Sequence, residues 1–188
     1  MTLTFTELTG FGLRLREWRE TDTAALREGM NDPEYRRWDG MTDGPLDEAG
    51  ALRQIRSRAE GWARGDLAQY CITDAATGEV LGSVGLHQIE PVRGCAGIGY
   101  WLMPGARGRG VVTRAVELCT RWSFAEVALH RIELGHAVGN EQSCRVALRT
   151  GYMAEGVARG GLPAPAPGVY VDMHVHARLA TDSVPSIG

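Results

Sequence analysis

The stretch of sequence best suited to chemistry is a glycine-rich turn between a strand pattern and a helix pattern. The turn runs Gly105-Ala-Arg-Gly-Arg-Gly110, and an amphipathic helix pattern begins at Val111. Flexible glycine backbone and the unpaired N–H groups of a first helical turn together make a binding site for anions. Arg107 and Arg109 add positive charge to it. The segment therefore predicts binding of a phosphate or pyrophosphate.

Two common phosphate-binding loops do not fit this turn. A P-loop requires Lys followed by Ser or Thr after its second glycine, where this chain has Val111 and Val112. A dinucleotide-binding fingerprint requires a third glycine, where this chain has Thr113. The pattern that fits is Arg-x-x-Gly-x-Gly/Ala, carried by Arg107 and Gly110, with Val112 departing from the small last residue.

This pattern resembles the pyrophosphate loop of the GNAT superfamily of acetyl-CoA-dependent N-acetyltransferases, and the nearest branch is RimJ/RimL-like. The resemblance covers nearly the whole chain in the family's order. Its further segments are residues 13–18, 21–22, 74–86, 129–134, 140–143, 150–152 and 155–156. It implies an α+β fold with a mixed, mostly antiparallel sheet of about seven strands and helices on both faces. A homodimer is common in this branch.

Composition limits the remaining possibilities. The 188 residues, 44% of them hydrophobic, suit one globular domain, placed at residues 1–180 with a disordered tail at 181–188. A net charge of −3 argues against nucleic acid as a partner, and all 20 cationic residues are arginine. The chain shows no signal peptide and no apolar run of membrane length, so we expect no membrane partner. No pair of the four cysteines has metal-ligand spacing, and we expect reduced thiols in the cytoplasm.

Periodicity predicts the elements that must hold the loop. Strands are expected at residues 12–17, 69–74, 80–87, 96–102, 131–137, 152–157 and 170–179. Helices are expected at 47–64, 111–128 and 141–149, and a short one begins at Thr21 or Asp22 and ends before Pro33. Loops at 39–45 and 162–168 should shape the acceptor pocket. On the last strand, polar residues from Tyr170 to Arg178 should share one face.

The resemblance also assigns the cofactor site. The backbone from Gly108 to Thr113 would cradle the pyrophosphate of acetyl-CoA. The strand at 96–103 would hold the pantetheine arm, and it would splay from the strand at 131–137 to open a V-shaped slot. The expected cofactor-binding residues are Leu102, Met103, Arg107, Gly108, Arg109, Gly110, Val111, Val112, Thr113, Asn140 and Ser143.

Acetyl transfer to an amine gains from a general acid that protonates the leaving thiolate. Asn140 and Ser143 match the branch's Asn-x-x-Ser pattern, and the resemblance makes Ser143 the acid. Asn140 also suits a helix N-cap, and both roles can hold. Many members of the superfamily use a tyrosine seven positions after that asparagine, but this chain has Ala147 there.

The general base is less clear from sequence. Many relatives carry a glutamate at the position that is Gly97 here. Histidine has a suitable pKa, so we consider His87 and His136, and favour His136 because it ends the strand that borders the slot. The further candidates are Glu90 and the group Asp172, His174 and His176. Deprotonation through water, without a protein base, is a third route.

Asp172, His174 and His176 also have the chemistry of metal ligands, but acetyl transfer needs no metal and we expect none. The predicted function is transfer of an acetyl group from acetyl-CoA to a primary amine by direct attack in a ternary complex. The acceptor is a protein N-terminal amine or a small-molecule amine. The alternative is a non-catalytic acetyl-CoA-binding sensor or partner protein, supported only by the missing glutamate at Gly97.

Overall fold

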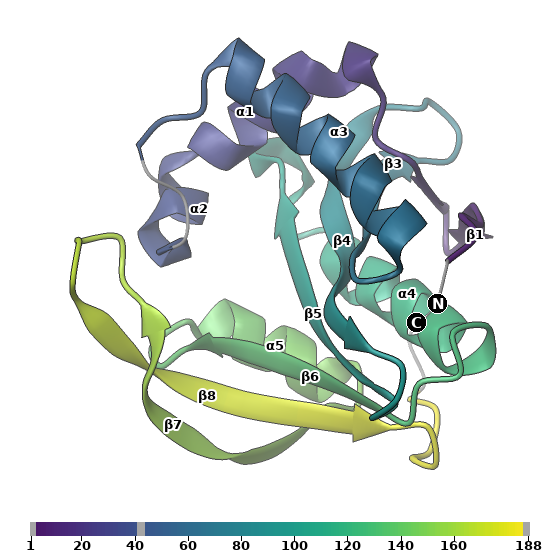
Figure 1. Cartoon of the computed structure of the whole chain (residues 1–188), viewed down its shortest axis with the longest axis vertical. Helices are drawn as coiled ribbons and strands as arrows, with labels where there is room; N and C mark the ends of the chain where they lie inside the picture. The colour runs from purple at the N-terminus through teal and green to yellow at the C-terminus, as the bar shows by residue number, and fades with distance from the viewer. Residues whose placement is uncertain (1–2, 41–43, 186–188) are drawn as a thin grey trace.

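The computed structural model describes residues 3–40 and 44–185 and is built on one eight-stranded sheet (Figure 1). The strand order is β1-β2-β3-β4-β5-β6-β8-β7. The strands are β1 Leu8–Gly10, β2 Leu13–Arg16, β3 Ala68–Asp74, β4 Val80–Glu90, β5 Cys95–Leu102, β6 Arg131–Ala137, β7 Met153–Pro163 and β8 Tyr170–Leu179. The helices are α1 Thr23–Asn31, α2 Pro33–Trp38, α3 Glu48–Arg64, α4 Val111–Ala125 and α5 Glu141–Arg149, with short 3-10 turns at Glu20–Asp22 and Pro104–Ala106.

The predicted fold class is confirmed, with one strand more than expected. Only β5 and β6 pair in parallel, and all the other neighbouring strands are antiparallel. The added strand, β1, folds back on β2 through a tight turn at Phe11 and Gly12. Both of these residues have positive φ, which suits a two-residue hairpin. A three-residue strand is too short for its alternation to stand out in the sequence.

Helices cover both faces of the sheet, as predicted. The α1–α3 group lies on one face, and α4 and α5 lie on the other (Figure 1). Because successive residues of a strand point to opposite faces, β5 serves both layers. Ile98 belongs to the main core with α4, whereas Trp101 packs in a smaller core with Leu26 of α1 and Ile55 of α3.

Two helix boundaries differ from the sequence prediction. The first helix ends before Pro33 as expected, but α2 then starts at once. Asp32 accepts a hydrogen bond from the Tyr35 N–H (3.0 Å), and Pro33 occupies the first helical position, where proline is favourable. Helix α4 stops at Ala125 rather than 128, and Ala128 has positive φ, which helical residues do not adopt.

The C-terminal hairpin is longer than predicted, and part of β8 is buried. Strand β7 continues through Leu162 and Pro163, which were expected in a loop, because an edge strand accommodates proline. The polar face of β8 is partly internal. His176 is fully buried, and Arg178 is buried in an ion pair with Glu117 of α4 (2.6 Å).

The expected tail and one expected loop are only partly described. Within 181–185, Asp182 accepts a hydrogen bond from the Leu179 N–H (2.8 Å), while residues 186–188 lie outside the described part. Residues 41–43 of the predicted loop at 39–45 also lie outside it. Among the described helices, none has the length and hydropathy needed to cross a bilayer. Every ion pair in the described segments uses arginine as the cation.

Candidate active site

A V-shaped opening in the sheet lies between β5 and β6. The two strands pair over three positions only, Cys95–Gly97 with Arg131–Glu133. Both strands then continue without a shared hydrogen-bond ladder, and Figure 1 shows them running apart. The predicted splay is therefore confirmed. Unpaired strand edges leave backbone N–H and C=O groups available to an extended ligand.

The glycine-rich loop leads directly into α4 beside this opening. Gly108 and Gly110 have φ of +73° and +70°, a conformation that residues with a Cβ rarely adopt. The first backbone bond of the helix runs from the Arg114 N–H to the Gly110 carbonyl (3.2 Å). The N–H groups from Val111 to Thr113 therefore have no intrahelical acceptor and can receive an anion.

The two arginines of the loop have different surroundings. Arg107 forms an ion pair with Asp32, the N-cap of α2, and also donates to the Leu102 carbonyl (3.2 Å). Burial opposes ionisation of Asp32, but hydrogen bonds from Arg107 and from the backbone N–H groups of Tyr35 and Glu34 together lower its pKa. Arg107 thus anchors the loop to α2. Arg109 is exposed, and its side chain donates a long hydrogen bond to the Gly105 carbonyl (3.4 Å) and also acts on the charge of Asp74, so a phosphate can reach its guanidinium.

At the end of β5, one expected contact point for the pantetheine arm already has a partner. The Met103 N–H donates to the Leu81 carbonyl (2.9 Å), and the Leu102 carbonyl accepts from Arg107. The Met103 carbonyl also accepts from the Ala106 N–H (3.0 Å), so a pantetheine arm could contact Met103 through its side chain and the second lone pair of that carbonyl.

Asn140 and Ser143 lie together at the start of α5. The Asn140 side chain accepts a hydrogen bond from the Ser143 N–H (3.1 Å), so Asn140 is the N-cap, which was one of its two expected roles. The Ser143 hydroxyl lies near the hydroxyl of Tyr100 on β5. Burial raises the pKa of Tyr100 to about 12, although Ser143 acts in the opposite direction. Within the described residues, the buried Tyr100 hydroxyl has no partner at hydrogen-bonding geometry.

Tyr100 is a candidate that sequence reasoning missed. The sequence held one indication. Successive residues of a strand point to opposite faces, so Tyr100 points away from the face that Gly99 and Trp101 share. Tyr100 therefore points toward the face of α4 and α5, where it meets Ser143 across the opening.

His87 occupies the space left by the glycine at position 97. His87 on β4 pairs with Gly97 on β5, the last residue of β5 that also pairs with β6. A Cβ atom built on Gly97 would lie 2.2 Å from Cε1 of His87, so the imidazole lies directly over this glycine. Burial lowers the pKa of His87, although a hydrogen bond with Gln88 acts against this. A neutral imidazole thus stands at the apex of the opening.

The other base candidates lie elsewhere. His136 has both ring nitrogens against protein groups, with Nδ1 3.0 Å from the Ala137 carbonyl and Nε2 3.2 Å from Nε2 of His176. Asp172 accepts a hydrogen bond from the Gly160 N–H (2.8 Å). Glu90 is exposed and pairs with Arg93. His136, His174 and His176 lie together beside α5. His87 is not part of this group.

The acetyltransferase (GNAT) domain model matches residues 12–153 of the sequence. The chain belongs to the GNAT family. It is 35% identical over 136 residues to the protein named probable N-acetyltransferase YjcK of Bacillus subtilis (strain 168), covering 71% of this chain and 73% of that protein. The matched domain is an acetyltransferase domain, and this relative is named as a probable N-acetyltransferase.

More distant similarities place the GNAT enzyme in the RimJ/RimL-like branch. It is 35% identical over 78 residues to the ribosomal-protein-serine acetyltransferase of Escherichia coli (strain K12), which is 42% of this chain and 44% of that protein. The ribosomal-protein-S5-alanine acetyltransferase of Vibrio fischeri shares its fold, with a TM-score of 0.83 and 20% identity over 96% of this chain and 100% of that one. The chain spans 46% and 44% of two curated relatives matched at 39% and 35% identity.

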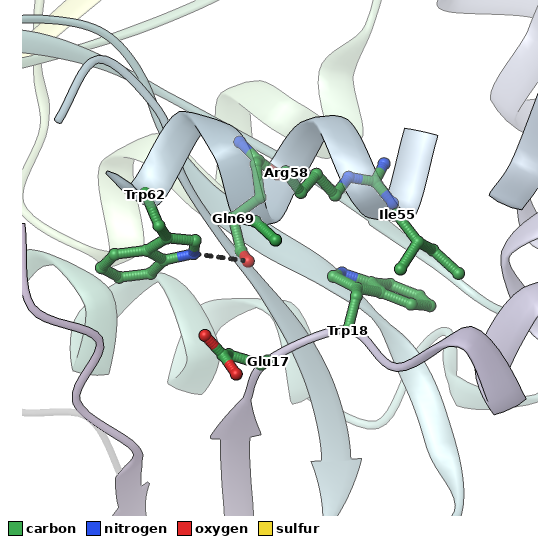
Figure 2. A pocket seen from close by; sticks show the side chains of 7 residues that line it. Glu17, Trp18, Ile55, Arg58, Trp62 and Gln69 are labelled. Atoms are coloured by element: carbon green, nitrogen blue, oxygen red, sulfur yellow. Dashed lines mark hydrogen bonds between the residues drawn. The ribbon is translucent and has the colours of Figure 1, made fainter. Parts of the chain in front are cut away.

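A small pocket of the GNAT enzyme lies away from the opening between β5 and β6, against α3 (Figure 2). Arg58 lies over the ring of Trp18 (5.2 Å to the centroid), and the Trp62 Nε1–H donates to the Gln69 carbonyl (3.3 Å). The pocket encloses about 30 Å³, which is room for very few water molecules. It is therefore not a substrate site.

Proposed function

We propose that this N-acetyltransferase acts on the N-terminal amine of a protein by direct attack on the thioester of acetyl-CoA. The observation that carries the proposal is the opening between β5 and β6, which has an anion cradle at the start of α4 and a neutral imidazole, His87, at its apex. The named ribosomal-protein acetyltransferases among its relatives and structural neighbours favour a protein N-terminus over a small amine.

The route into the opening favours an acceptor chain that enters with its terminus first. A Cβ atom on Gly40 would lie 1.9 Å from the Pro163 carbonyl, so the segment after α2 lies against the end of β7. These are the two regions expected to shape the acceptor pocket, and they meet. A chain terminus passes such a closed approach more easily than an amine in the middle of a folded surface.

In the proposed reaction a proton is accepted on one face of β5, and another proton is donated on its other face. His87 accepts the proton that the amine loses as it attacks the carbonyl carbon, because burial keeps its imidazole neutral. As the carbon–sulfur bond breaks, Ser143 donates a proton to the leaving thiolate and takes a proton in turn from solvent water, so that its hydroxyl is restored. The N–H groups from Val111 to Thr113 and the guanidinium of Arg109 bind the pyrophosphate. We rank His136 second as base, because both of its ring nitrogens face protein groups.

The test is thiol release from acetyl-CoA with a panel of acceptors. A peptide with a free N-terminal serine or alanine should support turnover. Its Nα-acetylated counterpart, a polyamine and an aminoglycoside should not. Ser143→Ala should reduce kcat on the order of 10²-fold, the lower range for losing an acid catalyst, with little change in KM for acetyl-CoA. The matched control is Gln142→Ala, an exposed neighbour on α5.

Two outcomes would contradict the proposal in different ways. Turnover with a small amine but not with peptides would replace the acceptor and keep the reaction. Acetyl-CoA binding without thiol release for any amine would favour the alternative, a non-catalytic sensor.

We also propose a cytoplasmic homodimer. The four free cysteines are consistent with a reducing compartment. Exposed apolar side chains occur along the C-terminal hairpin, where Met153 and Val157 of β7 and Tyr170 of β8 are 65%, 54% and 66% exposed. Light scattering should then give a mass near twice 20.4 kDa, and a monomer mass would contradict the dimer.

A further inference from the structure

Four soft donor groups from three elements converge beside α5. They are His136 on β6, His174 and His176 on β8, and Cys144 on α5, and one ligand atom from each lies within 4.8 Å of all the others. His136 and His174 are direct partners across the β6–β8 ladder. His136 and His176 are 6% and 0% exposed, whereas Cys144 and His174 are half-buried.

The hydrogen bonds of two of these histidines fix their tautomers. Nδ1 of His136 lies 3.0 Å from the Ala137 carbonyl, and Nδ1 of His176 lies 3.3 Å from the Tyr152 carbonyl. A carbonyl oxygen only accepts, so each Nδ1 carries the hydrogen and each Nε2 carries a lone pair. This is the arrangement that metal-binding histidines have, with the second nitrogen bonded to a carbonyl.

The two lone pairs point at each other. The Nε2 atoms of His136 and His176 are 3.2 Å apart. Two acceptors at this distance repel unless a proton or a cation lies between them. In a tetrahedral zinc site with Zn–N bonds of 2.0–2.1 Å, two nitrogens lie about 3.3 Å apart, close to the observed separation.

We propose that His136, Cys144, His174 and His176 bind one zinc ion. Imidazole nitrogen and thiolate sulfur suit zinc, whereas magnesium and calcium require oxygen ligands. Four protein ligands close the coordination sphere, so the ion has a structural role and no open position for chemistry. It would tie α5, which carries Asn140 and Ser143, to the pair of strands on one side of the opening.

We expected no metal from the sequence. The group of possible ligands that the sequence suggested differs from the group that the fold brings together. Spacing pointed to His174 and His176 with Asp172, whose carboxylate instead bonds to the Gly160 N–H. The fold brings His136 and Cys144 to the two β8 histidines from other elements. The inference stands apart from the choice of acceptor, and it is consistent with His87 rather than His136 as the base.

The first test is metal binding by untagged protein that has been stripped with a chelator. Titration with zinc against a chromogenic chelator should give about one equivalent per chain and raise Tm. Cobalt substitution should give the absorption of a tetrahedral site together with a sulfur-to-cobalt charge-transfer band. Zinc and cobalt are thus the probes, and neither readout depends on enzymatic activity.

The variants separate the site from adventitious binding. Cys144→Ser should abolish the charge-transfer band and weaken zinc binding by more than the ~10–100-fold that losing a supporting hydrogen bond costs. Cys95→Ser, a half-buried cysteine on β5, should change neither. His174→Ala should also weaken binding, while exposed His130→Ala should not. Retention of full zinc affinity by Cys144→Ser, or no stoichiometric binding by the wild type, would overturn the proposal.

Discussion

At the level of single residues, the apex of the opening shows how one side chain can stand in for another. The GNAT resemblance implies a glutamate at the position that is Gly97 here, and the imidazole of His87 fills the space above this glycine. A carboxylate on β5 and an imidazole on β4 would reach the same point from neighbouring strands. Both are bases of suitable strength once their surroundings have adjusted the pKa.

We predict that His87→Ala lowers kcat by about 10²–10⁴-fold, the usual contribution of a general base, and leaves KM for acetyl-CoA nearly unchanged. Because burial holds the pKa of His87 below its ordinary 6.5, the wild-type rate should rise with pH through that lowered value and level off at neutral pH. The rising limb should disappear in the variant. Steady-state kinetics from pH 5 to 9 would show both effects.

A second substitution makes this prediction specific. In the double variant His87→Ala/Gly97→Glu, the space vacated by the imidazole admits the glutamate, and part of the activity should return. Gly97→Glu alone should be inactive or unstable, because its Cβ would meet His87 at 2.2 Å. Full activity of His87→Ala, combined with loss of activity in His136→Ala, would move the base to His136.

The sequence could name His87 only as one base candidate among several. Its position over Gly97 depends on the register of β4 and β5, and that register shifts just after His87, where Gln88 has positive φ. Such an irregularity does not follow from local residue patterns. Tyr100 was missed for a related reason, since its nearness to Ser143 depends on how far β5 and β6 part.

At the level of elements, the loop before α4 combines flexible and rigid parts. Gly108 and Gly110 adopt left-handed backbone, whereas Gly105 has no such constraint and open space around its Cα. Arg107 fastens the middle of the loop to Asp32. The loop thus holds its N–H groups in place before any anion arrives, which lowers the entropy lost on binding.

We predict that Gly110→Ala destabilises the fold by about 1–2 kcal/mol, because an alanine in left-handed backbone costs that much. It should also raise the Kd for coenzyme A, because relaxing the strain turns the first N–H groups of α4 away from the phosphates. Gly105→Ala is the control and should change neither quantity. Urea unfolding and calorimetric titration would measure the two effects, and equal behaviour of the two variants would contradict the role of Gly110.

Local sequence patterns predicted several features of the helices and strands. The capping residue Asn140 and the first residue of α4 were read correctly from short motifs. The partner of Arg107 was not, because Asp32 lies 75 positions away in the sequence. The extension of β7 to Pro163 also escaped notice, since its place at the edge of the sheet is what permits proline there.

At the level of the whole molecule, the opening divides the sheet into two parts that need other links. The parallel ladder between β5 and β6 spans three positions. A second link is the ion pair between Glu117 of α4 and Arg178 of β8, at 2.6 Å with side chains 0% and 2% exposed. Arg178 also donates a hydrogen bond to the carbonyl of Thr150, the residue that follows α5 (3.0 Å). The contact therefore joins α4 to β8 and to the end of α5.

We predict that Glu117→Gln destabilises the protein by about 3–5 kcal/mol, because Arg178 would keep a buried charge with no anion beside it. The double variant Glu117→Gln/Arg178→Met should recover most of this loss, since removing both charges avoids the desolvation penalty. Glu126→Gln, on an exposed residue just after α4, should have little effect. Urea unfolding measures all three, and equal stability of Glu117→Gln and the wild type would contradict the prediction.

The use of arginine in every described ion pair has a practical consequence for a protein that handles a reactive thioester. All 20 cationic residues of the sequence are arginine, so no side chain carries a primary amine. A guanidinium is protonated at neutral pH and offers no lone pair to an acyl carbon. The protein is therefore immune to lysine self-modification when stored with its donor. In a mass spectrum, any acetyl group on a side-chain amine must belong to an acceptor.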